Sequence, residues 1–221
     1  MASDPHNWFM SAIGDPLNWD ISEGSEHGGA VSGSSSELGE LHDPITALIP
    51  FAGSRLAIGC RNSLHIITAD PAFASAEQMA ISRDIGIVGA HAWCQGPNKT
   101  IYFMGENGLY RLAPNDWDVT QSNRVSAGKM DRTFSSLDLS AVTARLIYDQ
   151  KNLGVHMFLS PRSQPSGATT HYYYDERGGG FWIMEYPAVV GPTTVYGLQG
   201  LDPSQRQILL GGHDGHVRVF S

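Results

Sequence analysis

Histidine, cysteine and carboxylate side chains come close together at two places in the sequence. His91 and Cys94 form an H-x-x-C pair, and His213, Asp214 and His216 form the run H-D-G-H. Such side chains bind a metal ion when three or four of them converge on one point. Both groups lie on a strand-like segment or at its tip, and neither supplies a full set of ligands. We therefore expect core or hairpin histidines here and no metal site.

Glycoside hydrolysis needs a pair of carboxylates, and Asp175 and Glu176 are adjacent in the chain. The run from Asp175 to Trp182 loosely resembles the Asp box of sialidase-type propellers, Ser-x-Asp-x-Gly-x-x-Trp, with its first glycine one place late. The run occurs once, and a hydrated turn explains it as well as an acid and base pair does. We expect the turn.

Two other catalytic motifs are missing from the sequence. No G-x-S-x-G nucleophile motif occurs. Gly178–Gly180 is not followed by the Lys-Ser/Thr of a phosphate-binding loop. The sequence therefore predicts a protein that is not an enzyme, with no catalytic, cofactor-binding or metal-binding residues. We expect no turnover of nucleotides, sugars or peptides.

A cluster of aromatic residues comprises Tyr172, Tyr173, Tyr174, Trp182 and Tyr186. Aromatic faces with polar rims bind sugars and protein partners. Alternation along a strand would place Tyr172 and Tyr174 on one face and Tyr173 on the other. Two interpretations stay open, namely a binding face for a glycan or partner and packing between sheets.

A hairpin phrase that occurs three times predicts the elements that carry these residues. In each copy an apolar segment precedes a two-residue turn, and a segment of alternating apolar and polar residues follows it. The turns are Asn62-Ser63, Asn107-Gly108 and Asp214-Gly215, and these residue types predict type I′ turns. The first two tips are 45 residues apart, close to the length of one propeller blade.

Four sheet units follow one another from Pro44 onward. They cover residues 45–68, 89–112, 141–187 and 194–220. The sequence therefore predicts an all-β, β-propeller-like fold with about four blade-like antiparallel sheet units. Residues 74–82 are the best candidate for a short helix.

The first 43 residues differ from the rest in composition. They contain 8 acidic residues, equal to the net charge of −8, and the first Lys or Arg of the chain is Arg55. Residues 22–40 are rich in Gly, Ser and Glu and would be disordered alone, so we expect neighbours to order them. We divide the chain into an N-terminal strand with an acidic arm, residues 1–43, and a body, residues 44–221.

Cysteine usage and hydropathy indicate where the protein is made. Cys60 and Cys94 lie in apolar, strand-like runs, which is typical of buried free cysteines. The sequence has no apolar run long enough to span a membrane and no signal peptide. We expect synthesis in a reducing cytoplasm.

The segment Phe9–Trp19, FMSAIGDPLNW, resembles a tract of the form (Y/F)-S-A-x-G-(D/N)-P-x-x-W. This tract is found in tail and head-to-tail joining proteins of tailed bacteriophages, including the tail nozzle of short-tailed phages. Asp43–Phe51, Leu64–Pro71 and Ile101–Arg111 are also similar to that family. The resemblance covers residues 7–114 well and the rest by pattern only.

The resemblance implies a virion structural protein of the neck or tail, made in the host bacterial cytoplasm. It would form a homo-oligomeric ring, six-fold or twelve-fold, and contact an adaptor, needle or fibre protein. DNA would pass through the lumen without sequence-specific binding, because an acidic surface repels phosphate. We expect residues 21–42 to lie on an adjacent chain or line this channel. Two alternatives stay open, namely a tail-tip propeller that recognises a host receptor or glycan and a glycoside hydrolase.

Overall fold

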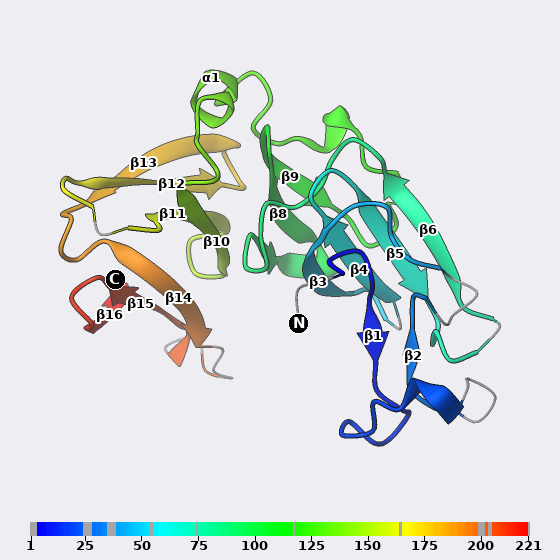
Figure 1. Cartoon of the computed structure of the whole chain (residues 1–221). Helices are drawn as coiled ribbons and strands as arrows, with labels where there is room; N and C mark the ends of the chain where they lie inside the picture. The colour runs from blue at the N-terminus through cyan, green and yellow to red at the C-terminus, as the bar shows by residue number, and fades with distance from the viewer. Residues whose placement is uncertain are drawn as a thin grey trace. The chain divides into compact units, whose positions relative to one another are not determined.

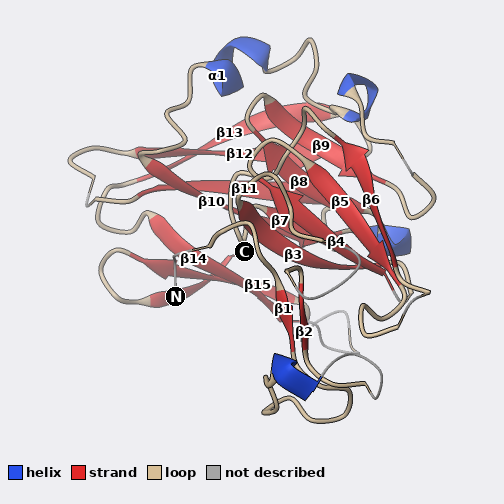
Figure 2. Cartoon of the chain, turned by 45° about the vertical axis from the view of Figure 1, so that its right-hand side comes forward, coloured by secondary structure: helices blue, strands red, loops and turns tan. Residues whose placement is uncertain are grey.

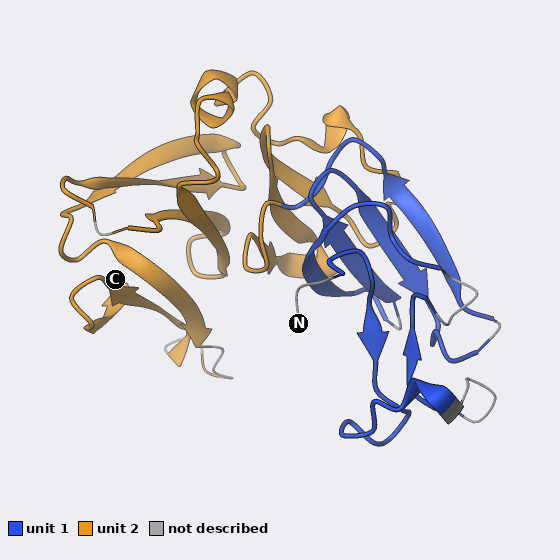
Figure 3. Ribbon diagram, in the orientation of Figure 1, with its two compact units in different colours: residues 1–87 blue, residues 88–221 orange. Residues whose placement is uncertain are grey.

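The fold is that of a computed structural model of the chain. The structure describes residues 4–23, 28–34, 39–53, 55–73, 75–116, 118–163, 165–198, 202 and 205–220. The chain divides into two compact units, residues 1–87 and residues 88–221 (Figure 3). Strands are the main regular secondary structure of both units, and the helices are short (Figure 2).

The first unit contains a two-stranded ribbon and a four-stranded sheet (Figure 1). The ribbon pairs β1 (Phe9–Met10) with β2 (Val31–Ser32). The sheet is formed by β3 (Ile45–Phe51), β4 (Arg55–Cys60), β5 (Leu64–Thr68) and β6 (Glu77–Ser82). A short 3-10 helix, η1 (Ile21–Glu23), lies between β1 and β2 in the chain.

The second unit contains three sheets (Figure 1). The first is formed by β7 (Trp93–Gln95), β8 (Ile101–Gly105) and β9 (Gly108–Leu112), and the second by β10 (Val142–Asp149), β11 (Gly154–Pro161), β12 (Thr169–Asp175) and β13 (Gly180–Tyr186). The third is formed by β14 (Pro192–Leu198), β15 (Gln207–Gly212) and β16 (Val217–Phe220). The unit also has the 3-10 helices η3 (Pro97–Lys99) and η4 (Gln121–Asn123) and the helix α1 (Asp131–Ser135).

The all-β fold class predicted from the sequence is confirmed. Within the described residues the strands form five antiparallel sheets, and in each sheet the neighbouring strands follow one another in the chain. The four larger sheets overlap the four units predicted from residue 45 onward, because period-two alternation and turn residues mark most strands locally. The first of these sheets also contains β6, which lies beyond the predicted unit of residues 45–68. None of the described helices is long and apolar enough to cross a membrane.

The helix predicted over residues 74–82 is wrong. Residues 77–82 form β6, the edge strand that pairs with β5, and Ala74 lies outside the described residues. In the strand, the backbone groups of β6 bond to those of β5, and Ile81 is buried. Tertiary pairing has therefore overridden a weak local helical pattern.

The type I′ turns predicted at the hairpin tips are also wrong. Type I′ requires positive φ at both central residues, and Asn62, Asn107 and Asp214 do not have it. At the last tip Gly212 N–H bonds to the carbonyl of His216, so the loop has three residues, and Gly215 has a φ of +77°. This is a turn that ends in a left-handed glycine, a common three-residue hairpin.

The arm packs against the four-stranded sheet of its own unit. Trp8, Val31 and Leu41 are buried in one cluster with Ile58 and Ile67 of β4 and β5. The arm therefore lies in the same compact unit as this sheet, residues 1–87. The described part of residues 21–42 is held by its own chain, and contact with a neighbouring copy stays a prediction.

The core of the second unit includes a cluster between its two C-terminal sheets. Phe158 of β11 packs with Ile208 and Leu210 of β15, and partly buried residues from β10, β13, β14 and β16 complete the cluster. Because β14 packs against β10 and β11, the sheet β14–β16 buries one face and leaves the other to solvent.

We expect Gly215→Ala to lower the free energy of unfolding by about 1 kcal/mol, because an alanine at a φ of +77° brings its Cβ close to the following carbonyl. Gly89→Ala is the matched control, since a Cβ there meets no atom within 4 Å and the backbone is not left-handed. Urea denaturation of both variants measures the difference. Equal stability of the two would contradict the assigned turn.

Candidate functional site

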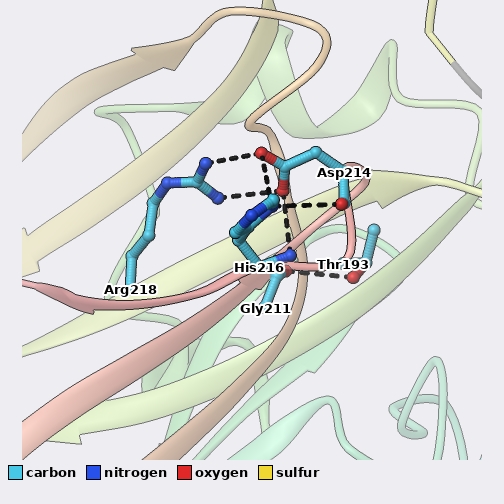
Figure 4. Close-up of polar contacts among 5 residues, drawn as sticks. All are labelled: Thr193, Gly211, Asp214, His216 and Arg218. Atoms are coloured by element: carbon cyan, nitrogen blue, oxygen red, sulfur yellow. Dashed lines mark hydrogen bonds and ion pairs between the residues drawn. The ribbon is translucent and has the colours of Figure 1, made fainter.

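The predicted H-D-G-H run forms the tip of the β15–β16 hairpin, where Asp214 and His216 lie beside Arg218 (Figure 4). Arg218 donates to both carboxylate oxygens of Asp214, at 2.9 and 2.5 Å, and the backbone N–H of His216 donates to Oδ1 at 3.1 Å. Thr193 Oγ1 donates to the carbonyl of Gly211 at 3.0 Å and fastens β14 to the base of the tip.

These contacts make Asp214 a structural residue of the tip. Hydrogen bonds from Arg218, and then from His216, hold the pKa of the Asp214 carboxyl well below its ordinary value. A carboxylate whose two oxygens already accept from a guanidinium is poorly placed to bind a metal ion. Among the residues that the structure describes, no group of three or more His, Cys, Asp and Glu side chains could hold one.

The two residues of the H-x-x-C pair differ in solvent exposure. His91 is exposed, whereas Cys94 is buried in β7. Both cysteines are free and buried, as the sequence predicted. Burial raises the pKa of the Cys94 thiol far above its usual range and that of Cys60 to about 11. Because the thiolate is the reactive form, neither cysteine is poised for nucleophilic or redox chemistry at neutral pH.

The adjacent carboxylates of Asp175 and Glu176 take different partners. Asp175 lies at the end of β12 and accepts from the backbone N–H of Arg177 at 3.0 Å, as expected of a turn residue. Glu176 instead accepts hydrogen bonds from Tyr102 Oη at 2.7 Å and from Tyr148 Oη at 2.5 Å. The two carboxylates therefore do not work on a shared point as an acid and a base would.

The cluster of Glu176 with Tyr102 and Tyr148 links β8 and β10, which belong to different sheets of the second unit. The two tyrosine rings are stacked, with centroids 6.0 Å apart, and Tyr102 is fully buried. A tyrosine beside a carboxylate is a nucleophile in some glycosidases. Here burial, and then the bond to Glu176, raise the pKa of both phenols above their ordinary value. This favours the neutral phenol, so the cluster is suited to joining sheets.

The aromatic residues of β12 and β13 follow the predicted alternation. Tyr172 and Tyr174 are buried. Tyr173 pairs with Trp182 across the two strands, and Trp182 is 65% exposed. Tyr172, Tyr174 and Trp182 therefore do not share an exposed face, which a glycan platform made from them would need.

Sequence reasoning missed two buried polar groups in the second unit. Asp149 and His156 form a buried pair, with Nε2 3.3 Å from Oδ2. Burial alone would raise the pKa of Asp149, but hydrogen bonds from His156, Asn152 and Lys151 lower it well below its ordinary value. His171 is fully buried, accepts from the backbone N–H of Leu159 at 2.9 Å through Nδ1, and lies 2.9 Å from Thr169 Oγ1 through Nε2. These histidines stood alone in apolar or aromatic runs, so no motif marked them.

Asp43, Ser63 and His65 come together in the first unit and also escaped the sequence analysis. Ser63 Oγ donates to Asp43 Oδ2 at 3.2 Å and lies 3.1 Å from His65 Nε2. In a catalytic triad the histidine lies between the serine and the acid, whereas here the serine lies between the other two. Asp43 also accepts from the backbone N–H of Asn62 at the hairpin tip. The trio therefore holds the tip rather than activating a nucleophile.

Comparisons with known proteins show distant similarity to solved structures alone. No protein family model matches the chain, and no curated protein sequence matches it. The extracellular domain of a one-component system from B. thetaiotaomicron is similar, with a TM-score of 0.45 and 15% identity. The match covers 82% of this chain but 21% of the other, so the chain spans about a fifth of the length of that structure. At this TM-score the similarity carries no argument about function.

The buried imidazole of His171 predicts a loss of stability in acid. Burial lowers its pKa to about 4, against about 6.5 in the unfolded chain. Between these values the unfolded state binds a proton that the native state does not. The contribution of neutral His171 to the free energy of unfolding is therefore present above pH 6.5. It is lost as the pH falls toward 4, by about 3 kcal/mol in total.

His171→Asn tests this contribution, because the Asn Oδ1 can still accept from the Leu159 N–H but does not titrate. We expect the unfolding free energy of the variant to vary less between pH 7 and 4 than that of the natural protein, in urea titrations at each pH. Parallel pH profiles of the two proteins would show that His171 does not take up the proton.

Proposed function

We propose that this chain is a structural subunit of the neck or tail of a tailed bacteriophage. In this proposal the four larger sheets are the blades of a propeller-like body, and copies of the chain assemble into a ring with a DNA channel. The ring would contact adaptor, needle or fibre proteins and act in the virion. The proposal rests on the resemblance of residues 7–114 to that family and on the observations that follow.

The hydrogen bonds made by the carboxylate side chains support a structural role. Asp175 and Asp214 accept from backbone N–H groups at hairpin tips, and Glu176 accepts from two buried tyrosines. Groups that the sequence singled out for chemistry thus have structural partners. The meander order of each sheet is also the order of strands within a propeller blade.

The observation that carries the proposal is an exposed apolar row on the C-terminal sheet. Tyr196 pairs with Leu209, and Leu209 pairs with Val219, so the three side chains lie side by side across β14, β15 and β16. Tyr196 is 65% exposed and Val219 is 55% exposed. Single exposed apolar residues are ordinary, whereas a contiguous group marks an interaction surface. In a ring, this face would pack against the next copy.

The alternative of a glycan-binding tip has weaker support. Its discriminating feature was a shared exposed face of Tyr172, Tyr174 and Trp182, and the first two are buried. A glycosidase would need two carboxylates facing one substrate, and Asp175 and Glu176 bind different partners. We therefore favour the structural role.

The assembly is tested by electron microscopy and native mass spectrometry of the purified protein. We expect rings with six or twelve copies, and we expect Val219→Lys to shift the protein to monomers, because a charge would be buried in the contact. Val189→Lys is the control, since Val189 is 58% exposed and lies outside the sheet of β14, β15 and β16. A protein that stays monomeric at high concentration, or rings that both variants preserve, would count against this contact.

A further inference from the structure

An apolar cavity lies in the first unit, between the arm and one face of the four-stranded sheet. Its volume is about 370 Å³, near the lower end of the range for ligand sites. Trp8 and Phe9 of the arm form one wall, and Leu48, Leu56 and Ile67 of three neighbouring strands form the floor and the opposite wall. The cavity exists because the arm crosses the sheet without filling the space beneath it.

The floor and the rim of this cavity differ in exposure. Ile67 is 2% exposed, whereas Phe9 and Leu48 are 56% and 55% exposed. A closed core would bury such large apolar side chains, since removing apolar surface from water is favourable. The rim therefore gains free energy when an apolar group covers it.

Charge limits what that group can be. Asp70 is the only ionisable residue among the described residues that line the cavity. The arm that forms one wall contains no Lys or Arg, and the first such residue of the chain is Arg55. A carboxylate ligand such as a fatty acid would be repelled, and nucleic acid would find no cation for its phosphates. A positive charge beside the apolar group would be attracted.

We propose that this cavity docks a segment of another protein through one large aromatic side chain flanked by Lys or Arg. The aromatic ring would fill the cavity against Leu56 and Ile67, and the rim residues Phe9 and Leu48 would cover its sides. The basic neighbour would lie near Asp70. Aromatic anchors in apolar pockets carry most of the free energy of many interfaces. This inference goes beyond the proposed assembly and does not depend on it.

The test uses NMR titration of the isotope-labelled full chain with three capped tripeptides, Lys-Trp-Lys, Glu-Trp-Glu and Lys-Ala-Lys. We expect Lys-Trp-Lys to shift the Trp8 indole N–H and the methyl signals of Leu56 and Ile67. Glu-Trp-Glu should bind about threefold more weakly at low salt, with the difference shrinking as salt is added. Lys-Ala-Lys should cause no shift at these groups.

Variants of two exposed residues provide the controls. Leu48→Glu should weaken binding of Lys-Trp-Lys about tenfold, because it places a charge against the ring. Met79→Glu should leave binding unchanged. Met79 is 40% exposed and pairs with Ile66, so it lies on the opposite face of the same sheet from Ile67. Phe9→Ala is a second rim variant, in case Leu48→Glu disturbs folding, and should also weaken binding.

Four outcomes would overturn the inference. These are the absence of shifts at millimolar Lys-Trp-Lys, equal binding of Lys-Ala-Lys, equal binding of Glu-Trp-Glu at low salt, and equal effects of Leu48→Glu and Met79→Glu. Self-association that Leu48→Glu abolishes would assign the cavity to a second copy of this chain instead. Asp70→Asn keeps an oxygen that can accept the N–H of Ala72, as Asp70 Oδ1 now does at 2.9 Å. It should remove the preference for Lys without abolishing binding, and an unchanged preference would contradict the role of Asp70.

Discussion

The structure depends on hydrogen-bond partners for the backbone N–H groups in the turns between its strands. A meander of short strands has many reversals, and each leaves N–H groups without a partner in the sheet. Aspartate carboxylates accept hydrogen bonds from several of these groups: Asp149 from the N–H of Lys151, Asp175 from that of Arg177 and Asp214 from that of His216. At the first tip the acceptor is Asp43, which comes from outside the hairpin. Acidic residues are therefore distributed by the needs of turns, and this explains why adjacent carboxylates do not combine into a reactive pair.

The same constraint acts between sheets, where polar side chains join surfaces that are otherwise apolar. Glu176 bonds to tyrosines of β8 and β10, and Ser160 donates to the carbonyl of Pro192 at the start of β14. Removing one partner from a buried hydrogen bond leaves the other unsatisfied, at a cost of about 1–3 kcal/mol. Such bonds favour one relative placement of neighbouring sheets within the second unit, because a shifted sheet would lose them.

Much of the fold could be predicted from the sequence because strands and turns are marked locally. The alternation of apolar and polar residues predicted most strands of the four larger sheets. It also predicted that Tyr172 and Tyr174 lie on a different face of the sheet from Tyr173. The errors arose where distant partners decide the outcome. Residues 77–82 became a strand because β5 offered an edge, and the tip at Asn62 takes its conformation with help from Asp43. Tyr102 and Glu176 are 74 residues apart, so no spacing rule could have joined them, and the cavity depends on the path of the arm across the sheet.

The packing of the arm has a consequence for how the chain folds during synthesis. Trp8 leaves the ribosome before its buried partners Ile58 and Ile67, which are translated up to 59 residues later. At about 5–20 residues per second, the arm waits roughly 3 to 12 s with its apolar side chains in water. Its many carboxylates and its lack of Lys and Arg keep nascent copies apart by charge repulsion in that interval. The acidic composition of the arm thus disfavours association between copies while its apolar side chains still lack their partners.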